Sequence, residues 1–431
     1  MITMADAKQA TIKKKSRASQ HLSDLVMQSY LVLQVAAKEK KFIIWAAICV
    51  PVEIFKGFKD IFVAIPENHS AMSAAKNAGV PLAQQAENLG YSMDLCSYAR
   101  IDLGTELGDA SLSPAGGLPR PNLLVSDTNN CSLLVKWFDI YHRLWNVPHF
   151  IIDVPFCYEG QQEKDRAYII SQFKSLIALI EQMTGQTFDA NKVKDALSHT
   201  NEALDIWKQF LALAAHKPSP ITAFDTFAHM APYVTLRGDP EVVRHCKILF
   251  KEMQKRIDTN EYPVPDEKYR LLWDNIAPWH QLRAMKSRLA KMGANIVHAT
   301  YTSCMGTIEG GFEHFSYDGS DPMQYLARMQ NFSVCPYGLK LRFKAMSEII
   351  EKIGIDGVIF ASNRSCKVYS VMQMDLQKMI AEKYGIPTIM VEVDHADVRK
   401  YSEENVFLRI EALLELIDQK RRMGQIDRSK I

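Results

Sequence analysis

The sequence predicts an α/β protein with two doubly wound, mainly parallel-sheet domains joined by a helical block. Two regions of the chain alternate short strand-like runs with helix-like stretches, which is typical of a parallel sheet covered on both faces by helices. The region between them carries mainly helical patterns. A chain of 431 residues is also too long for one compact core. We therefore expect an N-terminal helical segment, a first α/β domain, a helical block and a second α/β domain over residues 1–40, 41–164, 165–262 and 263–431.

The first α/β domain is predicted from four apolar runs. A helix over residues 21–37 precedes them, because its apolar residues recur at helical spacing. The first strand, 42–49, ends before Pro51, a residue that suits the first turn of a new helix. Further strands are expected at 60–65, 122–126 and 149–153, with a helical stretch at 70–89 between them.

The helical block is predicted from apolar stripes. The segments IISQFKSLIALIEQM and EVVRHCKILFKEMQKRI both place apolar residues at positions i, i+3, i+4 and i+7, which indicates amphipathic helices. The tripeptide Gly238-Asp239-Pro240 is typical of a helix start.

The second α/β domain repeats the pattern of the first. Strands are expected at 269–273, 295–298, 357–361 and 387–393, with helices at 340–353 and 371–384. The turn from the first strand to Pro278 resembles the turn to Pro51, and the strands at 122–126 and 357–361 both lead to a cysteine. The two domains are therefore expected to be related.

The composition indicates an ordinary globular protein. Hydrophobic residues make up 47% of the chain and charged residues 23%. The formal net charge of +2 argues against a nucleic-acid partner, because neutralising phosphates requires a concentrated basic surface. Residues 1–20 lack the apolar centre of a secretory signal, and the longest apolar run, 42–52, is too short to span a bilayer. We expect a cytoplasmic protein without a membrane partner.

Two of the eight cysteines lie at positions that suit metal chemistry. Cys131 and Cys366 each follow a predicted strand by five residues and precede a helix. Ligands bind beyond the carboxyl ends of such strands, and a helix N-terminus favours a thiolate. The chain lacks CxxC and ferredoxin-type spacing, so spacing alone leaves a structural coincidence open. Cys49 and Cys246 have the apolar neighbours of core residues, whereas Cys157, Cys304 and Cys335 are not assigned.

Several segments together resemble one family. LGYSMDLCSYARIDLG, GGLPRPNLLVSDTNNC, FIIDVPF and SNRSCKVYS are similar to the 2-hydroxyacyl-CoA dehydratase and benzoyl-CoA reductase family, and the likeness extends roughly over residues 41–420. Within that family, PENHSAM and the order of DLCSYAR and GGLPRP resemble the larger cluster-bearing, B-type subunit of ATP-dependent class I benzoyl-CoA reductase.

The resemblance implies a cofactor, partners and a function. It implies a [4Fe-4S] cluster held by Cys96, Cys131 and Cys366, of which Cys96 is indicated by the resemblance alone. The implied partners are a homologous second cluster-bearing subunit, ATP-hydrolysing iron–sulfur activator subunits, and benzoyl-CoA or a related acyl-CoA. The implied activity is the transfer of low-potential electrons to the ring of a coenzyme A thioester. The chain contains no GxxxxGK[ST] loop, which suits a subunit that receives electrons.

Three alternatives stay open at this stage. A second activity of the family, the radical dehydration of a 2-hydroxyacyl-CoA, needs the same kind of cluster. A non-catalytic subunit that relays electrons or serves as a scaffold is another. A binding protein without metal is the last.

Five further residues are candidates for supporting roles. Glu53 follows the first strand and either interacts with a helix dipole or moves a proton near the cluster. His69, after the second strand, either orients a helix or donates a proton. Arg100 beside Cys96 is expected to pack around the cluster or to bind a phosphate of coenzyme A. Arg364 and Ser365 precede Cys366: the positive charge of Arg364 is expected to stabilise a reduced cluster or a thiolate ligand, and Ser365 is expected to hydrogen-bond sulfur.

Aromatic residues of the second domain form one more candidate group. Trp273 and Trp279 mirror the Glu53 region, with His280 and Arg283 beside them. Aromatic side chains at that place suit the wall of a flat apolar acyl pocket, although tryptophan at a strand end is more commonly core.

Overall fold

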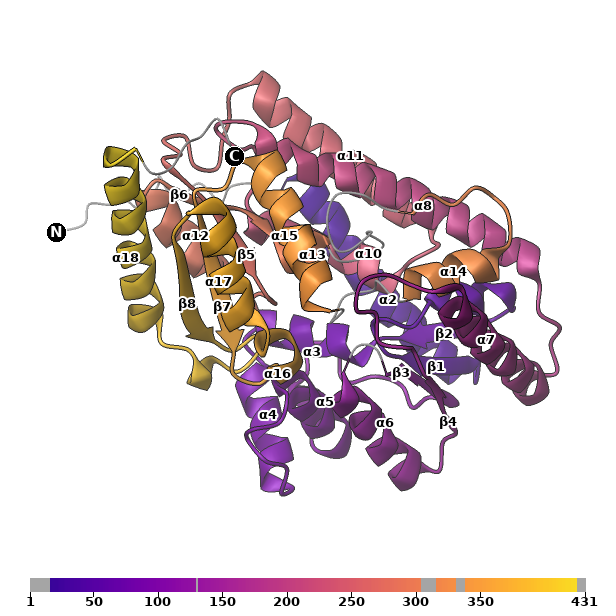
Figure 1. Ribbon diagram of the computed structural model, residues 1–431. Coiled ribbons are helices and arrows are strands. Elements are labelled where there is room, and N and C mark those ends of the chain that lie inside the picture. Colours follow the sequence, from indigo (N-terminus) through magenta and orange to yellow (C-terminus); the bar gives the residue numbers. More distant parts are fainter. Residues whose placement is uncertain (1–15, 129–130, 304–314, 331–337, 425–431) are drawn as a thin grey trace.

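Two parallel sheets organise the part of the chain that the structure, a computed structural model, describes: residues 16–128, 131–303, 315–330 and 338–424. The first sheet comprises β1 (Phe42–Ala46), β2 (Ile61–Ala64), β3 (Leu123–Asp127) and β4 (His149–Ile152). The second comprises β5 (Tyr269–Asp274), β6 (Ala294–Ala299), β7 (Gly357–Asn363) and β8 (Thr388–Val393). Figure 1 shows the two sheets in separate halves of the molecule, each with helices against it. The predicted α/β class with two doubly wound units is confirmed.

The two sheets have the same topology. Their strand orders are β2-β1-β3-β4 and β6-β5-β7-β8, so in each the order reverses between the first and the third strand. Such a reversal opens a crevice at the carboxyl ends of the strands, where ligands bind in this class of fold. Pro51 and Pro278 follow the first strands with nearly identical backbone angles, φ −74° and ψ 84° or 88°. The expected relation between the two units is therefore seen in their topology.

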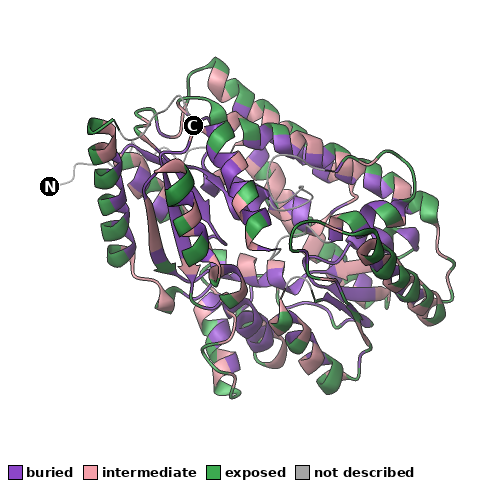
Figure 2. Cartoon of the chain, viewed as in Figure 1, coloured by how far each residue is buried: buried purple, intermediate pink, exposed green. Residues whose placement is uncertain are grey.

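Burial explains why the strands form. All residues of β3 and β6 are buried, as expected for strands covered on both faces. Figure 2 shows buried residues in the strands of both sheets, with exposed residues concentrated on the outer faces of the helices. The first strand is shorter than predicted, because the chain turns after Ala47, whose carbonyl accepts the backbone N–H of Val50 at 3.0 Å.

Long helices occupy the middle of the chain, as predicted. The longest are α7 (Glu163–Thr184), α8 (Ala190–Ala212) and α11 (Pro240–Asp258), with the shorter α9 (Ala223–His229) and α10 (Ala231–Thr235) between them. The side chain of Asp239 caps α11 by accepting a bond from the backbone N–H of Glu241, and Pro240 occupies the first turn. In Figure 1, α8 and α11 run together along one side of the molecule, while α2 (Arg17–Lys38) lies behind them. The expected domain boundaries remain a prediction.

The stretch predicted as helical over residues 70–89 forms two helices, α3 (Pro66–Ala75) and α4 (Gly79–Asn88). The chain breaks at Asn77, whose φ of 62° is incompatible with a continuous right-handed helix. Gly79 then allows a close approach to the second half, since a Cβ there would lie 2.7 Å from the carbonyl oxygen of Ala396. The break thus lets α4 contact a segment more than 300 residues away.

The remaining elements connect and cover the strands. They are η1 (Val52–Gly57), α5 (Ser97–Leu107), η2 (Ala110–Leu112), α6 (Ser132–Trp145), η3 (Leu213–Ala215), η4 (Trp279–Gln281), α12 (Leu282–Lys291), α13 (Thr300–Ser303), α14 (Pro322–Gln330), α15 (Leu339–Ile353), α16 (Lys367–Ser370), α17 (Gln373–Tyr384), η6 (Val398–Lys400) and α18 (Glu403–Arg422). The expected helices at 340–353 and 371–384 correspond to α15 and α17.

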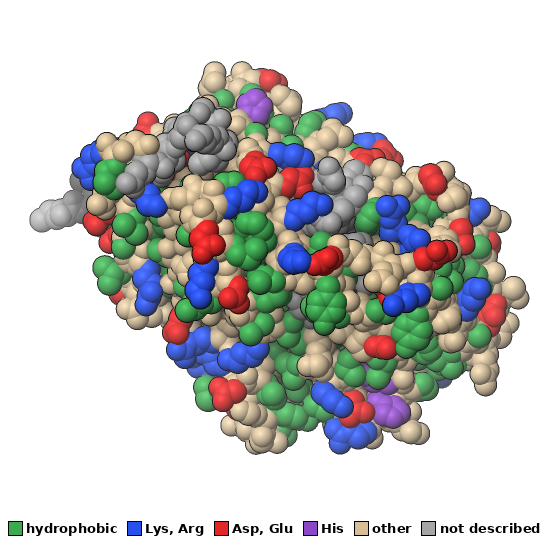
Figure 3. Space-filling view, in the orientation of Figure 1, with side chains coloured by type: hydrophobic (Ala, Val, Ile, Leu, Met, Phe, Trp, Pro, Cys, Tyr) green, Lys and Arg blue, Asp and Glu red, His purple; other side chains and the backbone are tan. Residues whose placement is uncertain are grey.

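Charges on the surface are mixed. On the face shown in Figure 3, lysine and arginine side chains alternate with aspartate and glutamate. Pairs such as Lys383 with Glu351, 3.1 Å apart, contribute to this pattern. Among the helices of the described residues, none combines the length and apolar character needed to cross a bilayer.

Replacing Gly104 by alanine tests the close packing of α5 on α4. A Cβ at position 104 would lie 1.8 Å from the carbonyl oxygen of Leu82, so the two helices must separate. Helix propensity alone favours alanine by about 1 kcal/mol. We predict instead that Gly104→Ala lowers the free energy of unfolding by about 1–3 kcal/mol, as overpacking does, measured by chemical denaturation.

Gln84→Ala, on the exposed face of α4, is the matched control and should change stability little. A Gly104→Ala protein as stable as the control would contradict the described packing.

Candidate functional site

Three cysteines occupy the same local position in three different helices. Cys96 is the N-cap residue of α5, Cys131 that of α6 and Cys366 that of α16. Cys131 follows β3 and Cys366 follows β7, which are equivalent strands of the two sheets. Both cysteines therefore lie beyond the carboxyl ends of strands at the reversal of strand order. Cys96 lies in the helical connection between β2 and β3.

The three thiols are close enough to interact electrostatically. Burial raises the pKa of Cys96 far above its ordinary value, and the neighbouring Cys366 and Cys131 add to that rise. Burial likewise raises the pKa of Cys366 to about 12, with a contribution from Cys131. Burial is also the largest cause of the raised pKa of Cys131. The fold thus brings three half-buried cysteines from both halves close enough for their charges to interact.

Backbone amides point at each sulfur atom. N–H groups of Ala99 and Tyr98 lower the pKa of Cys96, against the larger effect of burial. Those of Leu133 and Leu134 act on the pKa of Cys131, and that of Tyr369 on the pKa of Cys366. Amides at helix N-termini stabilise negative sulfur.

These residues fit an iron–sulfur cluster. Three converging thiols supply the ligand type that such clusters require, and the amides supply hydrogen bonds to sulfur. Burial by itself keeps the thiols protonated. A metal ion binds cysteine as the thiolate, so these thiols would lose their protons when a metal binds.

A polar network closes around the cysteines from both halves. Ser97 donates to Asp394 at 2.7 Å and lies 3.0 Å from Ser365, which donates to the other oxygen of Asp394 at 2.6 Å. His395 Nε2 lies 3.6 Å from the sulfur of Cys96 and 3.0 Å from Ser97 Oγ. Burial lowers the pKa of His395 to about 4, so its imidazole is neutral near pH 7. Ser365, predicted to lie near the cluster, belongs to this network.

Arg100 fixes α5 against the second half. Its guanidinium is fully buried and pairs with Glu87 at 2.6 Å and Asp397 at 2.9 Å. Asp397 and Glu87 also bind Arg399, at 2.7 Å and 2.6 Å. The expectation that Arg100 binds a phosphate of coenzyme A remains a prediction. In the structure, its guanidinium pairs with two carboxylates of the protein itself.

Arg364 differs from its neighbour Ser365. Its side chain is exposed and pairs with Glu392 at 2.7 Å. Together with Arg399, Lys400 and Arg409 it lines a shallow surface pocket at the start of α18.

Glu53 is buried in an ion pair. Its carboxylate lies 3.2 Å from Arg237 and accepts a hydrogen bond from Thr200 at 3.1 Å. Arg237 also donates to the backbone carbonyls of Ile48 and Val50, so the pair joins the end of β1 to the helical block. A role for Glu53 in proton transfer remains a prediction.

His69 is fully buried in α3. Its Nε2 lies 2.7 Å from the hydroxyl of Ser113, and its Nδ1 faces Asp102. Glu67 and Asn68, which precede His69 in the sequence, line a cavity between α2 and α3. A role for His69 as a proton donor also remains a prediction.

A cavity of about 740 Å³ opens between α2, α3, α9 and η4. Tyr98 and Trp279 line it and contact each other through the indole N–H and the phenol oxygen. The ring of Tyr98 also packs against His395, which lies 3.6 Å from the sulfur of Cys96, so this wall of the cavity is one side chain away from that cysteine. Trp279 thus lines a cavity, which is one of the two roles predicted for these aromatic residues. Trp273 is buried and belongs to the core, which is the other.

Glu67 is the residue of this cavity that sequence reasoning missed. Its Oε1 accepts the backbone N–H of Ile48 at 2.9 Å, whereas its Oε2 is buried without a hydrogen-bond partner. Burial raises the pKa of Glu67 to about 8, so it is mainly protonated near pH 7. When Glu67 is ionised, its charge adds to the rise in the pKa of Cys131 and of Tyr98. The sequence signal, a glutamate after Pro66 at a helix start, is equally typical of a dipole interaction.

The other cysteines divide into two groups. Cys49 and Cys246 are buried, as predicted for core residues, and Cys157 is buried as well. Cys304 and Cys335 lie outside the described residues.

Comparison with known proteins gives a consistent picture. The family described as "2-hydroxyglutaryl-CoA dehydratase, D-component" matches residues 45–417. The alpha subunit of (R)-phenyllactyl-CoA dehydratase from Clostridium sporogenes is 29% identical over 95% of this chain and 97% of its own length. The alpha subunit of (R)-2-hydroxyisocaproyl-CoA dehydratase from Clostridioides difficile is 29% identical, over 96% and 99%. The B subunit of benzoyl-CoA reductase from Thauera aromatica is 27% identical, over 84% and 85%.

Iron content tests the cysteine site. We predict that Cys96→Ala, Cys131→Ala and Cys366→Ala each lose most of the iron bound by the anaerobically purified protein, because each removes one thiolate ligand. Cys246→Ala, a buried cysteine of α11, is the control and should keep its iron. Full iron content in any one of the first three variants would remove that residue from the ligand set.

Glu53→Gln tests whether the buried ion pair is structural. We predict that it lowers the free energy of unfolding by about 3 kcal/mol, because Arg237 keeps a buried charge without its partner. Glu392→Gln breaks the exposed pair with Arg364 and should cost less than about 1 kcal/mol. Equal stability of the two variants, by chemical denaturation, would contradict this interpretation.

Proposed function

From the premise that this chain belongs to the 2-hydroxyglutaryl-CoA dehydratase D-component family, we propose that it is the iron–sulfur subunit of an enzyme acting on an acyl-CoA. The observation that supports the proposal is that three helix-capping cysteines interact electrostatically, while Tyr98, two residues from one of them, lines a cavity. Proteins of the family carry the names of dehydratases and of a reductase, both of acyl-CoA thioesters.

In this proposal Cys96, Cys131 and Cys366 hold a [4Fe-4S] cluster. Such a cluster, when bound, supplies single electrons at low potential. The residues of this chain tune that chemistry: amides of three helix N-termini bond to sulfur, and His395 lies against Cys96. Ser365 and Arg364 act behind Cys366, the first within the buried network and the second at the surface.

The cavity is proposed to hold the acyl group. Its walls include Tyr98, Trp279, Phe227 and Tyr301, so an apolar or aromatic acyl chain would be buried favourably. Its volume of about 740 Å³ is in the range of sites for small ligands. The exposed cations Lys76 and Arg283 also line it and are suited to the phosphates of coenzyme A.

Glu67 is proposed to hold the proton that the reaction moves. It lines the cavity, its Oε2 is free, and its pKa of about 8 keeps it protonated near neutral pH. A carboxyl group that has a raised pKa and lines the cavity is suited to general acid–base catalysis.

Two reactions use such a site. Dehydration of a 2-hydroxyacyl-CoA is our first candidate, because the family is named for it and relatives that match nearly the whole chain are dehydratase alpha subunits. Reduction of benzoyl-CoA, which the sequence motifs favoured, is the second. The aromatic walls of the cavity support it, as does the similarity to the B subunit of benzoyl-CoA reductase.

The relatives are named as subunits, so we propose partner chains as well. A homologous second subunit with its own cluster completes the enzyme. Because the sequence lacks a GxxxxGK[ST] loop, a separate ATP-hydrolysing iron–sulfur protein is proposed to deliver the electrons.

One assay separates the two reactions. The reconstituted complex is given ATP, a strong reductant, and either (R)-phenyllactyl-CoA or benzoyl-CoA. A dehydratase forms the unsaturated acyl-CoA with only catalytic amounts of electrons, whereas a reductase consumes electrons and ATP in proportion to product. Turnover of neither substrate class by an iron-loaded complex would refute an acyl-CoA function with an aromatic acyl group.

Glu67→Gln tests the proposed proton carrier. We predict that kcat falls by about 10²–10⁴-fold while the iron content is unchanged, because glutamine fills the same space without a transferable proton. Wild-type activity should decline as pH rises through about 8, where the buried carboxyl of Glu67 loses its proton.

Glu392→Gln serves as the control and should keep wild-type kcat and pH profile. A Glu67→Gln enzyme with normal kcat, or an activity that rises through pH 8, would exclude Glu67 from this role.

A further inference from the structure

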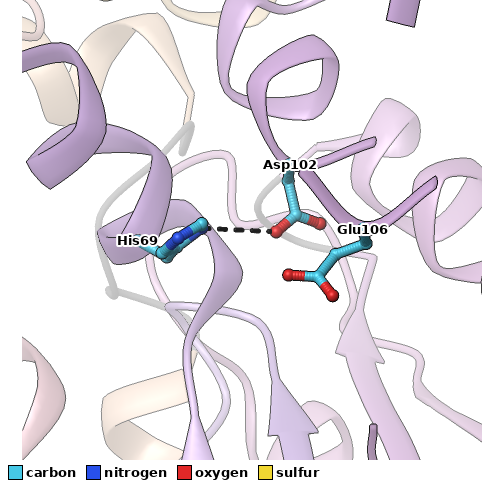
Figure 4. Close-up of side chains that lie close together, drawn as sticks. All are labelled: His69, Asp102 and Glu106. Atoms are coloured by element: carbon cyan, nitrogen blue, oxygen red, sulfur yellow. Dashed lines mark ion pairs between the residues drawn. The ribbon is translucent and has the colours of Figure 1, made fainter. Parts of the chain in front are cut away.

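A second group of potential ligands lies where α3 packs against α5. Figure 4 shows His69 of α3 pointing toward Asp102 and Glu106 of α5. The two carboxylates are four residues apart and therefore share one face of the helix. One ligand atom from each of the three side chains lies within 4.8 Å of the other two.

The atoms that face each other lack hydrogen-bond partners. His69 Nδ1 and Asp102 Oδ1 are 3.8 Å apart, which is too long for a hydrogen bond. Both side chains are fully buried, and neither atom has another partner. A pair of polar atoms left unpartnered in a dry interior is costly, unless something binds between them.

The remaining atoms of these side chains are held in place. His69 Nε2 lies 2.7 Å from Ser113 Oγ, which leaves Nδ1 as the atom directed at Asp102. Asp102 Oδ2 accepts hydrogen bonds from Tyr141 at 2.6 Å and Trp137 at 3.0 Å. Partners of this kind orient the ligands of metal sites.

The charges around the group also suit a bound cation. Burial, followed by the charge of Asp102, raises the pKa of Glu106 to about 8. The charge of Asp102 also acts on Glu67 and Tyr141 in the same direction. Arg100, the cation of α5 itself, is paired with Glu87 and Asp397 instead, and the charge of Arg120 lowers the pKa of Glu106 by less than burial and Asp102 raise it.

We propose that His69, Asp102 and Glu106 bind one divalent cation of the zinc class, separate from the cysteines. Imidazole nitrogen and carboxylate oxygen are common ligands of Zn²⁺. Glu106 keeps one oxygen for this role, because the other accepts the backbone N–H of Leu118 at 2.8 Å. The ion joins α3 to α5, the helix that begins at Cys96, and so holds the cysteine helix from its far end. His69 is then a ligand rather than a proton donor.

Metal analysis of the wild-type protein is the direct test. The anaerobically purified full chain is analysed for zinc and iron by mass spectrometry, and zinc is examined by X-ray absorption. The expected result is about one zinc per chain with nitrogen and oxygen neighbours at about 2.0–2.2 Å. Absence of zinc after Zn²⁺ is supplied, or sulfur neighbours at about 2.3 Å, would overturn the proposal.

Variants assign the ligands. His69→Gln and Asp102→Asn should lose zinc but keep iron, since the asparagine oxygen still accepts the bonds from Tyr141 and Trp137. His298→Gln, which alters another fully buried histidine, should keep both metals. Retention of zinc in either ligand variant would overturn the proposal. The iron measurement separates this outcome from a failure of the cysteine site.

Discussion

The partial burial of three cysteines at the boundary between the two halves is the constraint on which the rest of the structure depends. Sulfur atoms of Cys96, Cys131 and Cys366 are drawn from both halves, and removing them from water opposes the thiolate form. Helix N-termini act in the opposite direction and favour the thiolate form, because backbone amides at each capping position point at a sulfur atom. The halves must therefore close with three helix ends pointing at one place.

Polar contacts across the boundary maintain that closure. Ser97 of the first half meets Ser365 and Asp394 of the second, and Arg100 meets Asp397. These groups are buried, so each contact is strong when paired and costly when broken. The same segment that supplies the contacts, residues 394–397, also meets Gly79 and Cys96. One short loop after β8 thus holds α4 and α5 together with the cysteine site.

Much of the architecture follows from the sequence, because strand and helix periodicity is a local property. All eight described strands were predicted, as was the correspondence between Cys131 and Cys366, since strand–turn–helix patterns are visible in the chain. Contacts between distant segments were not predictable in this way. Glu67 and His395 carry no distinctive spacing, and their place beside the cysteines depends on how the halves close. The burial of Glu53 against Arg237 likewise requires the helical block to be in place.

The most direct measurement is an anaerobic crystal structure with diffraction data collected at the iron absorption edge. The account predicts anomalous scattering from iron between Cys96, Cys131 and Cys366, at the ends of α5, α6 and α16. Iron located elsewhere in the chain, or three unligated thiols in crystals of protein that contains its full iron, would contradict it.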